Sequence, residues 1–327
     1  MRPITRRRFA AGVAGAAVLA MPRAFAQGSW PEKPIKLVVP FPPGGGADFL
    51  GRLLAQRLGE GLRQSIVVDN KPGAATTIGA DAVAKAAPDG YTLLLLLRDM
   101  AINPSLMPSL PYDTLAAFAW IGKVAEGPFV FVVNPKVEAR TLAEFRAMAK
   151  AKPGAVSYGS LGVGGMGHLS VEAMARHLGV SLLHVPYKGA GPALAATVSG
   201  EVQATLAALT GAVPFIRGGR LRALAVGSDK RVSQLPDVPT VAEAGGGAET
   251  VLPQFYAMAA PAGTPAAIVE RLSGELKRVL AEPEMAEKMI QNGLTPAFSS
   301  PDAFRAEITA DIARFAKLVK DVGITMQ

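Results

Sequence analysis

The sequence predicts an α/β protein of two domains, and three observations support this prediction. Short apolar runs alternate with helical patterns along the chain, which is typical of strands connected by helices. A chain of 327 residues, half of them hydrophobic, is long enough to fill two cores of ordinary size. Two of the apolar runs end in glycine-rich turns that open helices, at residues 41–48 and 160–167.

The predicted strands are short runs rich in aliphatic and β-branched residues. They cover residues 35–40, 65–69, 91–96, 129–134, 156–159, 182–186, 204–208, 221–226 and 254–260. Helical patterns separate most of them, and strands joined through helices usually run in the same direction. We therefore expect a largely parallel sheet.

The predicted helices show apolar positions at helical spacing and recognisable start signals. They cover residues 48–60, 76–86, 141–151, 167–178, 191–199, 265–281 and 301–322. Thr141 precedes Glu144 by three residues, as in a capping box. Pro265 and Pro301 stand where a first helical residue is expected.

The last predicted helix has a long apolar face that needs a partner. Phe304, Ile308, Ile312, Phe315 and Val319 share one side of it, and the neighbouring sequence offers no sheet to cover them. We expect the C-terminal helices to fold back onto the N-terminal sheet. The chain would then form one discontinuous domain, residues 27–127 plus 252–327, and one inserted domain, residues 128–251.

The first 26 residues predict an export signal. A basic segment ends at residues 5–9, an apolar segment of about 13 residues follows, and Ala24-Phe25-Ala26 matches the pattern for cleavage before Gln27. The apolar segment is too short to span about 30 Å of hydrocarbon comfortably. Residues 5–9 resemble a twin-arginine signature, and general secretion is the alternative route. We expect a periplasmic protein.

The basic net charge of +8 comes largely from this leader. Five of the 34 Lys and Arg lie in the first 27 residues, so 29 remain against 26 Asp and Glu, a net charge of +3. Charges of both signs alternate along the later helices, which does not favour a nucleic-acid partner. The chain has no Cys, so it can form no disulfide.

The two glycine-rich turns are candidate anion sites. In each, a strand leads through glycines into the start of a helix, where backbone N–H groups point outward and favour negative charge. Side chains there would keep an anion from the amides, which explains the glycines. Two such sites suggest a receptor that closes on a small anion.

The chain resembles the periplasmic solute receptors of tripartite tricarboxylate transporters, the Bug family. The resemblance rests on eight segments in order, among them VVPFPPGGGAD, DNKPGAATTIGADAVAKAAPDGYTLLL, HVPYKGAGPAL and LRALAVGSDKRVSQLPDVPTVAEAG. It implies a Venus-flytrap periplasmic-binding-protein fold, with two α/β domains joined by crossing strands. It also implies that a small carboxylate binds between the lobes, for delivery to a membrane permease. We expect a monomer without a cofactor.

The resemblance and the residues themselves together give the candidate ligand-binding residues. These are Phe41, Pro42, Gly44, Gly45, Ala47 and Asp48 in the first turn, Ser160, Gly164, Gly165 and His168 in the second, and Arg98, Asp99, Tyr187, Lys188 and Ala207 elsewhere. Asp48 is more simply a partner of the helix dipole. His168 has packing or helix capping as its alternative role, and Lys188 has plain solvation. Tyr187 could offer a ring and a hydroxyl to a bound acid.

The chain departs from the family pattern at several of these positions. Arg98 and Asp99 replace a small loop; either Arg98 faces the cleft and binds a second carboxylate, or the two side chains pair at the surface. Gly165 stands where relatives usually have a hydroxyl. Ala207 stands where an Asp often binds a ligand amine, which makes an amino-acid ligand less expected. Residues 254–257 replace an aromatic-glycine pair, so the pocket shape should differ.

Other functions find less support in the sequence. Residues 162–167 spell GxGxxG, but the next predicted strand ends in Tyr187-Lys188 rather than in the acid that a dinucleotide site needs. The three histidines, His168, His177 and His184, form no metal-binding pair of the HExxH type. We expect a receptor that is not an enzyme. An exported enzyme acting on a carboxylate, or a ligand sensor for a membrane signalling protein, remains the alternative.

Overall fold

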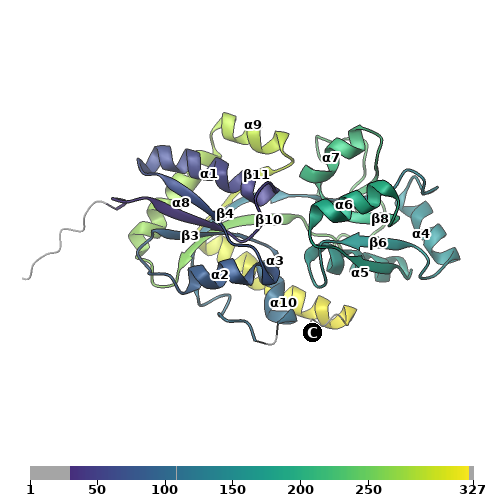
Figure 1. Ribbon diagram of the computed structural model, residues 1–327, viewed down its shortest axis with the longest axis horizontal. Coiled ribbons are helices and arrows are strands. Elements are labelled where there is room, and N and C mark those ends of the chain that lie inside the picture. The colour runs from purple at the N-terminus through teal and green to yellow at the C-terminus, as the bar shows by residue number, and fades with distance from the viewer. Residues whose placement is uncertain (1–29, 108, 324–327) are drawn as a thin grey trace, which may run out of the picture. The chain divides into compact units, whose positions relative to one another are not determined.

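Figure 1 shows a computed structural model of the chain, which describes residues 30–107 and 109–323. The predicted export signal lies outside the described residues. The chain divides into two units, residues 1–32 and 33–327, and the fold below is that of the second. Across the described ranges, every helix is too short or too polar for a membrane span.

Within the described residues, the strands form two sheets, one of six strands and one of five. The first sheet has the order β11-β4-β10-β3-β1-β2. Its strands are β1 (Ile35–Val39), β2 (Ile66–Asn70), β3 (Thr92–Leu97), β4 (Phe118–Gly127), β10 (Gln254–Pro261) and β11 (Thr295–Ser299). The second sheet has the order β7-β6-β8-β5-β9. Its strands are β5 (Phe129–Val133), β6 (Ser157–Ser160), β7 (Leu183–Pro186), β8 (Ala204–Ala208) and β9 (Arg222–Gly227).

Helices accompany each sheet (Figure 1). With the first sheet lie α1 (Gly46–Leu62), the 3₁₀ turn η1 (Ala74–Thr76), α2 (Thr77–Ala84), α3 (Asp99–Leu106), α8 (Ala266–Leu280), α9 (Pro283–Gln291) and α10 (Pro301–Val322). With the second lie α4 (Leu142–Ala151), α5 (Met166–Leu178), α6 (Ala190–Ser199) and α7 (Leu209–Arg217). The Thr141 side chain caps α4 by accepting a hydrogen bond from the Glu144 backbone, as the sequence predicts.

The C-terminal helices pack on the first sheet, which confirms that the chain folds back. Both α8 and α10 contact β4, and α10 also contacts α3. Phe304 of α10 is fully buried and meets Trp120 and Phe255 edge to ring, with centroids 5.5 and 5.1 Å apart. Edge-to-face contact adds to the free energy gained from burying such large rings. Tertiary packing therefore satisfies the apolar face of the last helix.

The prediction of a largely parallel sheet is wrong, because both sheets are mixed. Strand β1 runs parallel to β2 and β3, but β10 runs antiparallel to β3 and β4, and β11 runs antiparallel to β4. In the second sheet β5 runs antiparallel to β8 and β9. The chain passes from β4 directly into β5 and returns from β9 into β10. These crossing segments need no helical connection, so they are free to run against their neighbours.

The sequence prediction missed β4, β11, α3, α7 and α9. Charged residues interrupt the apolar pattern of β4, where Lys123 pairs with Glu126 at 2.8 Å and with Glu307 of α10 at 2.9 Å. A proline lies inside both α3 and α7, and proline normally argues against a helix interior. In each case tertiary contacts outweigh the local signal.

Candidate functional site

The first glycine-rich turn ends at the N-terminus of α1 with open backbone amides. Gly44 has a φ of 87°, a left-handed conformation that favours glycine. Gly45 is the N-cap residue, and no side chain in the described chain caps the helix through it. The first N–H groups of a helix have no partner within it. An added Cβ on Gly45 would meet only the Pro42 carbonyl oxygen, at 4.0 Å.

Asp48 holds this turn in place. Its carboxylate is 5 % exposed and accepts hydrogen bonds of 3.0 Å from the Gly44 backbone N–H and from Asn70 Nδ2. The hydrogen bond from Arg52 is the main cause that lowers the pKa of Asp48, and the bonds from Gly44 and Asn70 add to it. The Asn70 amide also reaches the Phe41 carbonyl at 3.1 Å. Asp48 therefore contributes to the shape of the turn, beyond a simple interaction with the helix dipole.

The second glycine-rich turn has the same construction at the start of α5. Gly162 and Gly164 have φ values of 142° and 78°. Gly165 is the N-cap residue, again without a capping side chain among the described residues. His168, in the first turn of the helix, accepts a 3.0 Å hydrogen bond on Nδ1 from the Gly164 backbone N–H. The histidine therefore stabilises the turn through this hydrogen bond, which agrees with the helix-capping role that the sequence offered as an alternative to ligand binding.

His168 stacks on His184 with ring centroids 3.7 Å apart. Burial lowers the pKa of each histidine to about 4, and the neighbouring His168 lowers that of His184 further. Both rings are therefore neutral near pH 7, as His168 must be to accept a hydrogen bond on Nδ1. His184 Nε2 lies 2.6 Å from Ser160 Oγ, and that hydroxyl also donates to the Gly162 carbonyl at 3.0 Å. Ser160 is 1 % exposed, so this serine and histidine stabilise the turn from inside the protein.

Asp99 connects the first sheet to the start of α5. Its Oδ2 accepts a 2.7 Å hydrogen bond from Gln254 Nε2 on β10. Its Oδ1 lies 3.5 Å from the Met166 backbone nitrogen, the first residue of α5. Burial is the main cause that raises the pKa of Asp99. The carboxylate of Asp99, at the start of α3, thus faces the amides of the second glycine-rich turn.

The Tyr256 hydroxyl lies close to the start of α1. A Cβ built on Gly46 would lie 3.4 Å from the Tyr256 hydroxyl and 3.7 Å from Thr210 Oγ1 at the start of α7. Burial raises the pKa of Tyr256, and the negative charge of Asp99 raises it further. The start of α1 and the start of α7 therefore lie close to the Tyr256 hydroxyl, and the Asp99 carboxylate at the start of α5 is near enough to affect its pKa.

Sequence reasoning missed the roles of Gln254, Tyr256 and Thr210. The only available signal for the first two was their departure from the family pattern at residues 254–257. Gln254 lies 155 residues from Asp99 in the chain, so no local pattern could join them. Thr210 begins a helix that the sequence did not predict.

The structure places Arg98 in surroundings that neither sequence interpretation described. Its side chain is buried, pairs with Asp311 of α10, and lies 3.3 Å from Glu307 Oε1. The guanidinium carbon also lies 4.5 Å from the centre of the Phe255 ring, a favourable cation–π contact. Arg98 thus links the end of β3 to α10. It is not paired with Asp99 at the surface, and its binding of a ligand carboxylate stays a prediction.

Three other predicted site residues lie in different surroundings. The Tyr187 hydroxyl donates to Glu201 Oε1 at 2.8 Å, so it is occupied within the second sheet. Lys188 is exposed. Ala207 is 2 % exposed and packs in an apolar cluster with Leu194 and Leu209. These contacts describe the surroundings of Tyr187 and Ala207, and their binding of a ligand stays a prediction.

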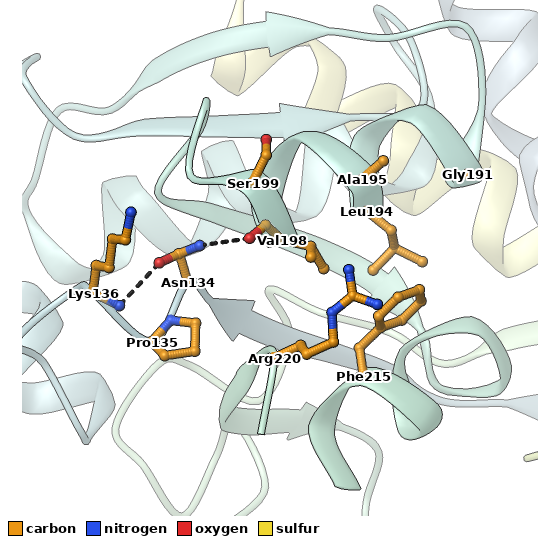
Figure 2. Close-up of a pocket in the computed structure, with 10 residues that line it drawn as sticks. All are labelled: Asn134, Pro135, Lys136, Gly191, Leu194, Ala195, Val198, Ser199, Phe215 and Arg220. Atoms are coloured by element: carbon orange, nitrogen blue, oxygen red, sulfur yellow. Dashed lines mark hydrogen bonds between the residues drawn. The ribbon is translucent and has the colours of Figure 1, made fainter. Parts of the chain in front are cut away.

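Figure 2 shows a cavity of about 560 Å³ on the second sheet. Leu194 and Val198 of α6 line one side, and Phe215 and Arg220 line the other, with the guanidinium carbon 5.2 Å from the ring centre. Asn134 donates to the Val198 carbonyl at 3.0 Å. None of the predicted site residues lines this cavity. Across the described residues, no three His, Asp or Glu side chains gather as a metal site would require.

Comparison with known proteins identifies the family of the chain. Residues 50–324 match the family model described as "Tripartite tricarboxylate transporter family receptor". The chain is 38% identical to Protein BugT of Bordetella pertussis over 301 residues, which cover 91% of this chain and 92% of that protein.

Solved structures of periplasmic binding proteins are also similar to the chain. The chain is similar to an R. palustris protein solved with adipate, at a TM-score of 0.84 and 33% identity, covering 91% of this chain and all of that one. It is similar to the periplasmic binding protein BugD, at a TM-score of 0.81, 33% identity and the same coverage. MatC from Rhodopseudomonas palustris with bound malate gives a TM-score of 0.79 and 28% identity, covering 88% and 99%. The predicted fold class is confirmed: a two-lobed periplasmic-binding-protein fold, with two α/β domains joined by crossing strands.

Proposed function

The chain belongs to the tripartite tricarboxylate transporter receptors, and we propose that it binds a small organic acid between its two lobes for delivery to a membrane permease. Relatives solved with adipate and with malate support a carboxylate as the ligand. In this proposal the lobes are residues 27–127 plus 252–327 and residues 128–251. The receptor is a monomer with no enzymatic activity.

The open N-terminus of α1 carries the proposal. The turn before it is fixed by Asp48 and Asn70, so the amides are already in place before a ligand arrives. Gly45 leaves the approach to them free of side-chain atoms. A carboxylate accepting these N–H groups would gain charge-assisted hydrogen bonds and a favourable interaction with the helix dipole.

Gly45→Val tests this site. Gly45 has φ −89° and ψ 175°, an extended conformation that valine adopts readily, so we expect the fold to be retained. The added methyl groups block the amides. If two hydrogen bonds to a charged group are lost, each worth about 1.5–3 kcal/mol, affinity should fall by roughly 10²- to 10⁴-fold.

The assay is calorimetry of the mature protein against mono- and dicarboxylates of increasing length. Gly191→Val is the matched control, because Gly191 also lies in the first turn of a helix and a Cβ there has open space. Unchanged affinity in Gly45→Val would remove the turn from the site. If the unaltered protein binds none of these acids detectably, the proposal that its ligand is a carboxylate is refuted.

The family and the periplasmic relatives also support export. We propose that the receptor acts in the periplasm after cleavage between Ala26 and Gln27. Mass spectrometry of the protein recovered from the periplasm measures this directly. A mature chain that begins at Gln27 is the expected result, and recovery of the uncleaved chain from the cytoplasm would contradict it.

A further inference from the structure

The carboxylate of Asp99 has only neutral hydrogen-bond partners among the residues that the structure describes. These are the Gln254 side-chain amide at 2.7 Å and the Met166 backbone N–H at 3.5 Å. Acidic groups are seldom buried without a cation. The adjacent cation, Arg98, is already engaged by two carboxylates of α10. Asp99 therefore brings between the two sheets a negative charge that no ion pair among the described residues neutralises, and the charge of Arg98 offsets its burial only in part.

This charge lies where a ligand anion at the α5 N-terminus would lie. Asp99 Oδ1 approaches the Met166 nitrogen, and a Cβ on Gly165 would be 4.0 Å from the same oxygen. A second ligand carboxylate bound at these amides would face the Asp99 carboxylate at close range in a partly buried site. Like charges in such a site repel strongly. The two glycine-rich turns are therefore not equivalent: α1 is open to an anion, and α5 already faces one.

We propose that Asp99 sets the specificity of the cleft by selecting acids that carry one carboxylate and, at the other end, a hydrogen-bond donor, above all an ammonium group. This inference rests on the proposed function and adds the orientation of the ligand in the cleft. The ligand carboxylate lies at the α1 amides and its donor end at Asp99. Zwitterionic amino acids bind better than dicarboxylates of the same length.

The surroundings of Asp99 favour a donor in two ways. A carboxylate has about four acceptor positions, and the two neutral donors leave part of this capacity unused. Burial raises the pKa of Asp99, and a cation beside it would offset the cost of that burial. Asp99 is the first residue of α3, which lies with the first sheet. It is thus distinct from Ala207 on the second sheet, the position where an amine-binding Asp was expected from the family pattern.

The test compares ligands that differ only at one end. Calorimetry measures the dissociation constants of unbranched dicarboxylates and ω-amino acids of three to six carbons, paired by length, with the unaltered protein and with Asp99→Asn. Asparagine keeps the shape and can still accept from Gln254, so the substitution removes the charge and the long 3.5 Å contact that accepts from the Met166 N–H. We expect the unaltered protein to prefer the amino acid by at least about tenfold at the best length. In Asp99→Asn we expect this preference to fall by about 10- to 100-fold, since a charge-assisted hydrogen bond becomes a neutral one.

Two further variants keep the result interpretable. Asp229→Asn removes one negative charge from an exposed position and should leave both affinities unchanged. Asp99→Ser removes the same charge with a smaller side chain, and it replaces Asp99→Asn if thermal unfolding shows that the latter is not folded.

Each outcome decides the proposal. If dicarboxylates bind the unaltered protein more tightly at every length, or if removing the charge leaves the preference unchanged, the role of Asp99 is refuted while the carboxylate receptor stands. If none of these acids binds, the proposed function fails and this inference fails with it.

Discussion

Replacing Arg98 with methionine should destabilise the protein strongly and leave a stranded carboxylate in its core. Asp311 is 7 % exposed and pairs with the Arg98 guanidinium. Methionine fills most of the volume but cannot pair. Removing one partner of a buried ion pair typically costs about 3–5 kcal/mol, and loss of the cation–π contact with Phe255 adds to this. Against a usual total of about 5–15 kcal/mol, this is a large share of the free energy of unfolding.

Equilibrium unfolding in urea at pH 7 and pH 5 measures the effect. Burial is the main cause that raises the pKa of Asp311, and Arg98 opposes it. Without Arg98 that pKa rises further above its unfolded value. A carboxyl group of this kind destabilises the fold when it is charged, and protonation relieves the penalty as the pH falls. We therefore expect the deficit of Arg98→Met to be largest at pH 7 and smaller at pH 5.

The double variant Arg98→Met/Asp311→Leu is the control. With both charges gone, most of the stability should return, because apolar side chains of similar volume often replace a buried pair without loss. Glu307 is not stranded, since Lys123 holds it at 2.9 Å. A loss below about 1 kcal/mol in the single variant, or no recovery in the double variant, would refute this account. Lost ligand affinity with unchanged stability would instead support a guanidinium in the cleft.

Two further predictions follow from buried rings. The folded-state pKa of about 4 for His168 and His184 lies below the usual 6.5, so the unfolded chain takes up protons first as the pH falls. Each histidine should therefore lower the free energy of unfolding by up to about 2 kcal/mol between pH 7 and pH 5. The variant His168→Gln should show a weaker pH dependence of stability in urea unfolding. A pH profile that is the same in the variant would contradict this. Phe304→Ala should lower the free energy of unfolding by about 3–5 kcal/mol, because the ring is fully buried between Trp120 and Phe255; a loss under 1 kcal/mol would mean that the cavity collapses.

Local sequence patterns were enough to predict most of the strands and helices that the structure shows. Apolar runs gave the strands that are buried on both faces, and cap signals at Thr141 and Pro301 gave helix starts. The missed strand β4 shows where such reasoning fails. Its Lys123 is held by two carboxylates, one of them 184 residues away on α10, and only the folded chain brings them together. Strand direction was also out of reach, because it depends on how the chain crosses between sheets.

The glycine-rich turns were predictable because their requirement is local. A left-handed residue and an uncapped helix start call for glycine within a few positions, as Gly44 and Gly164 show. What surrounds the turns was not predictable. Two neutral histidines support the second turn, yet His184 comes from a different strand and is recognisable only by its stacking on His168.

Arg98 and Asp99 show most clearly how position in the fold decides the role of a charge. As neighbours in the sequence they invite pairing, but Arg98 points to α10, and Asp99 meets Gln254 and the start of α5. Because the guanidinium is paired with Asp311, it forms no ion pair with Asp99, and its charge lowers the pKa of Asp99 less than burial raises it. The negative charge between the lobes is therefore left for a ligand to balance, while the α1 amides attract an anion. A ligand that binds both the α1 amides and Asp99 must carry a carboxylate at one end and a positively charged donor at the other. The preference for amino acids over dicarboxylates should therefore depend on Asp99.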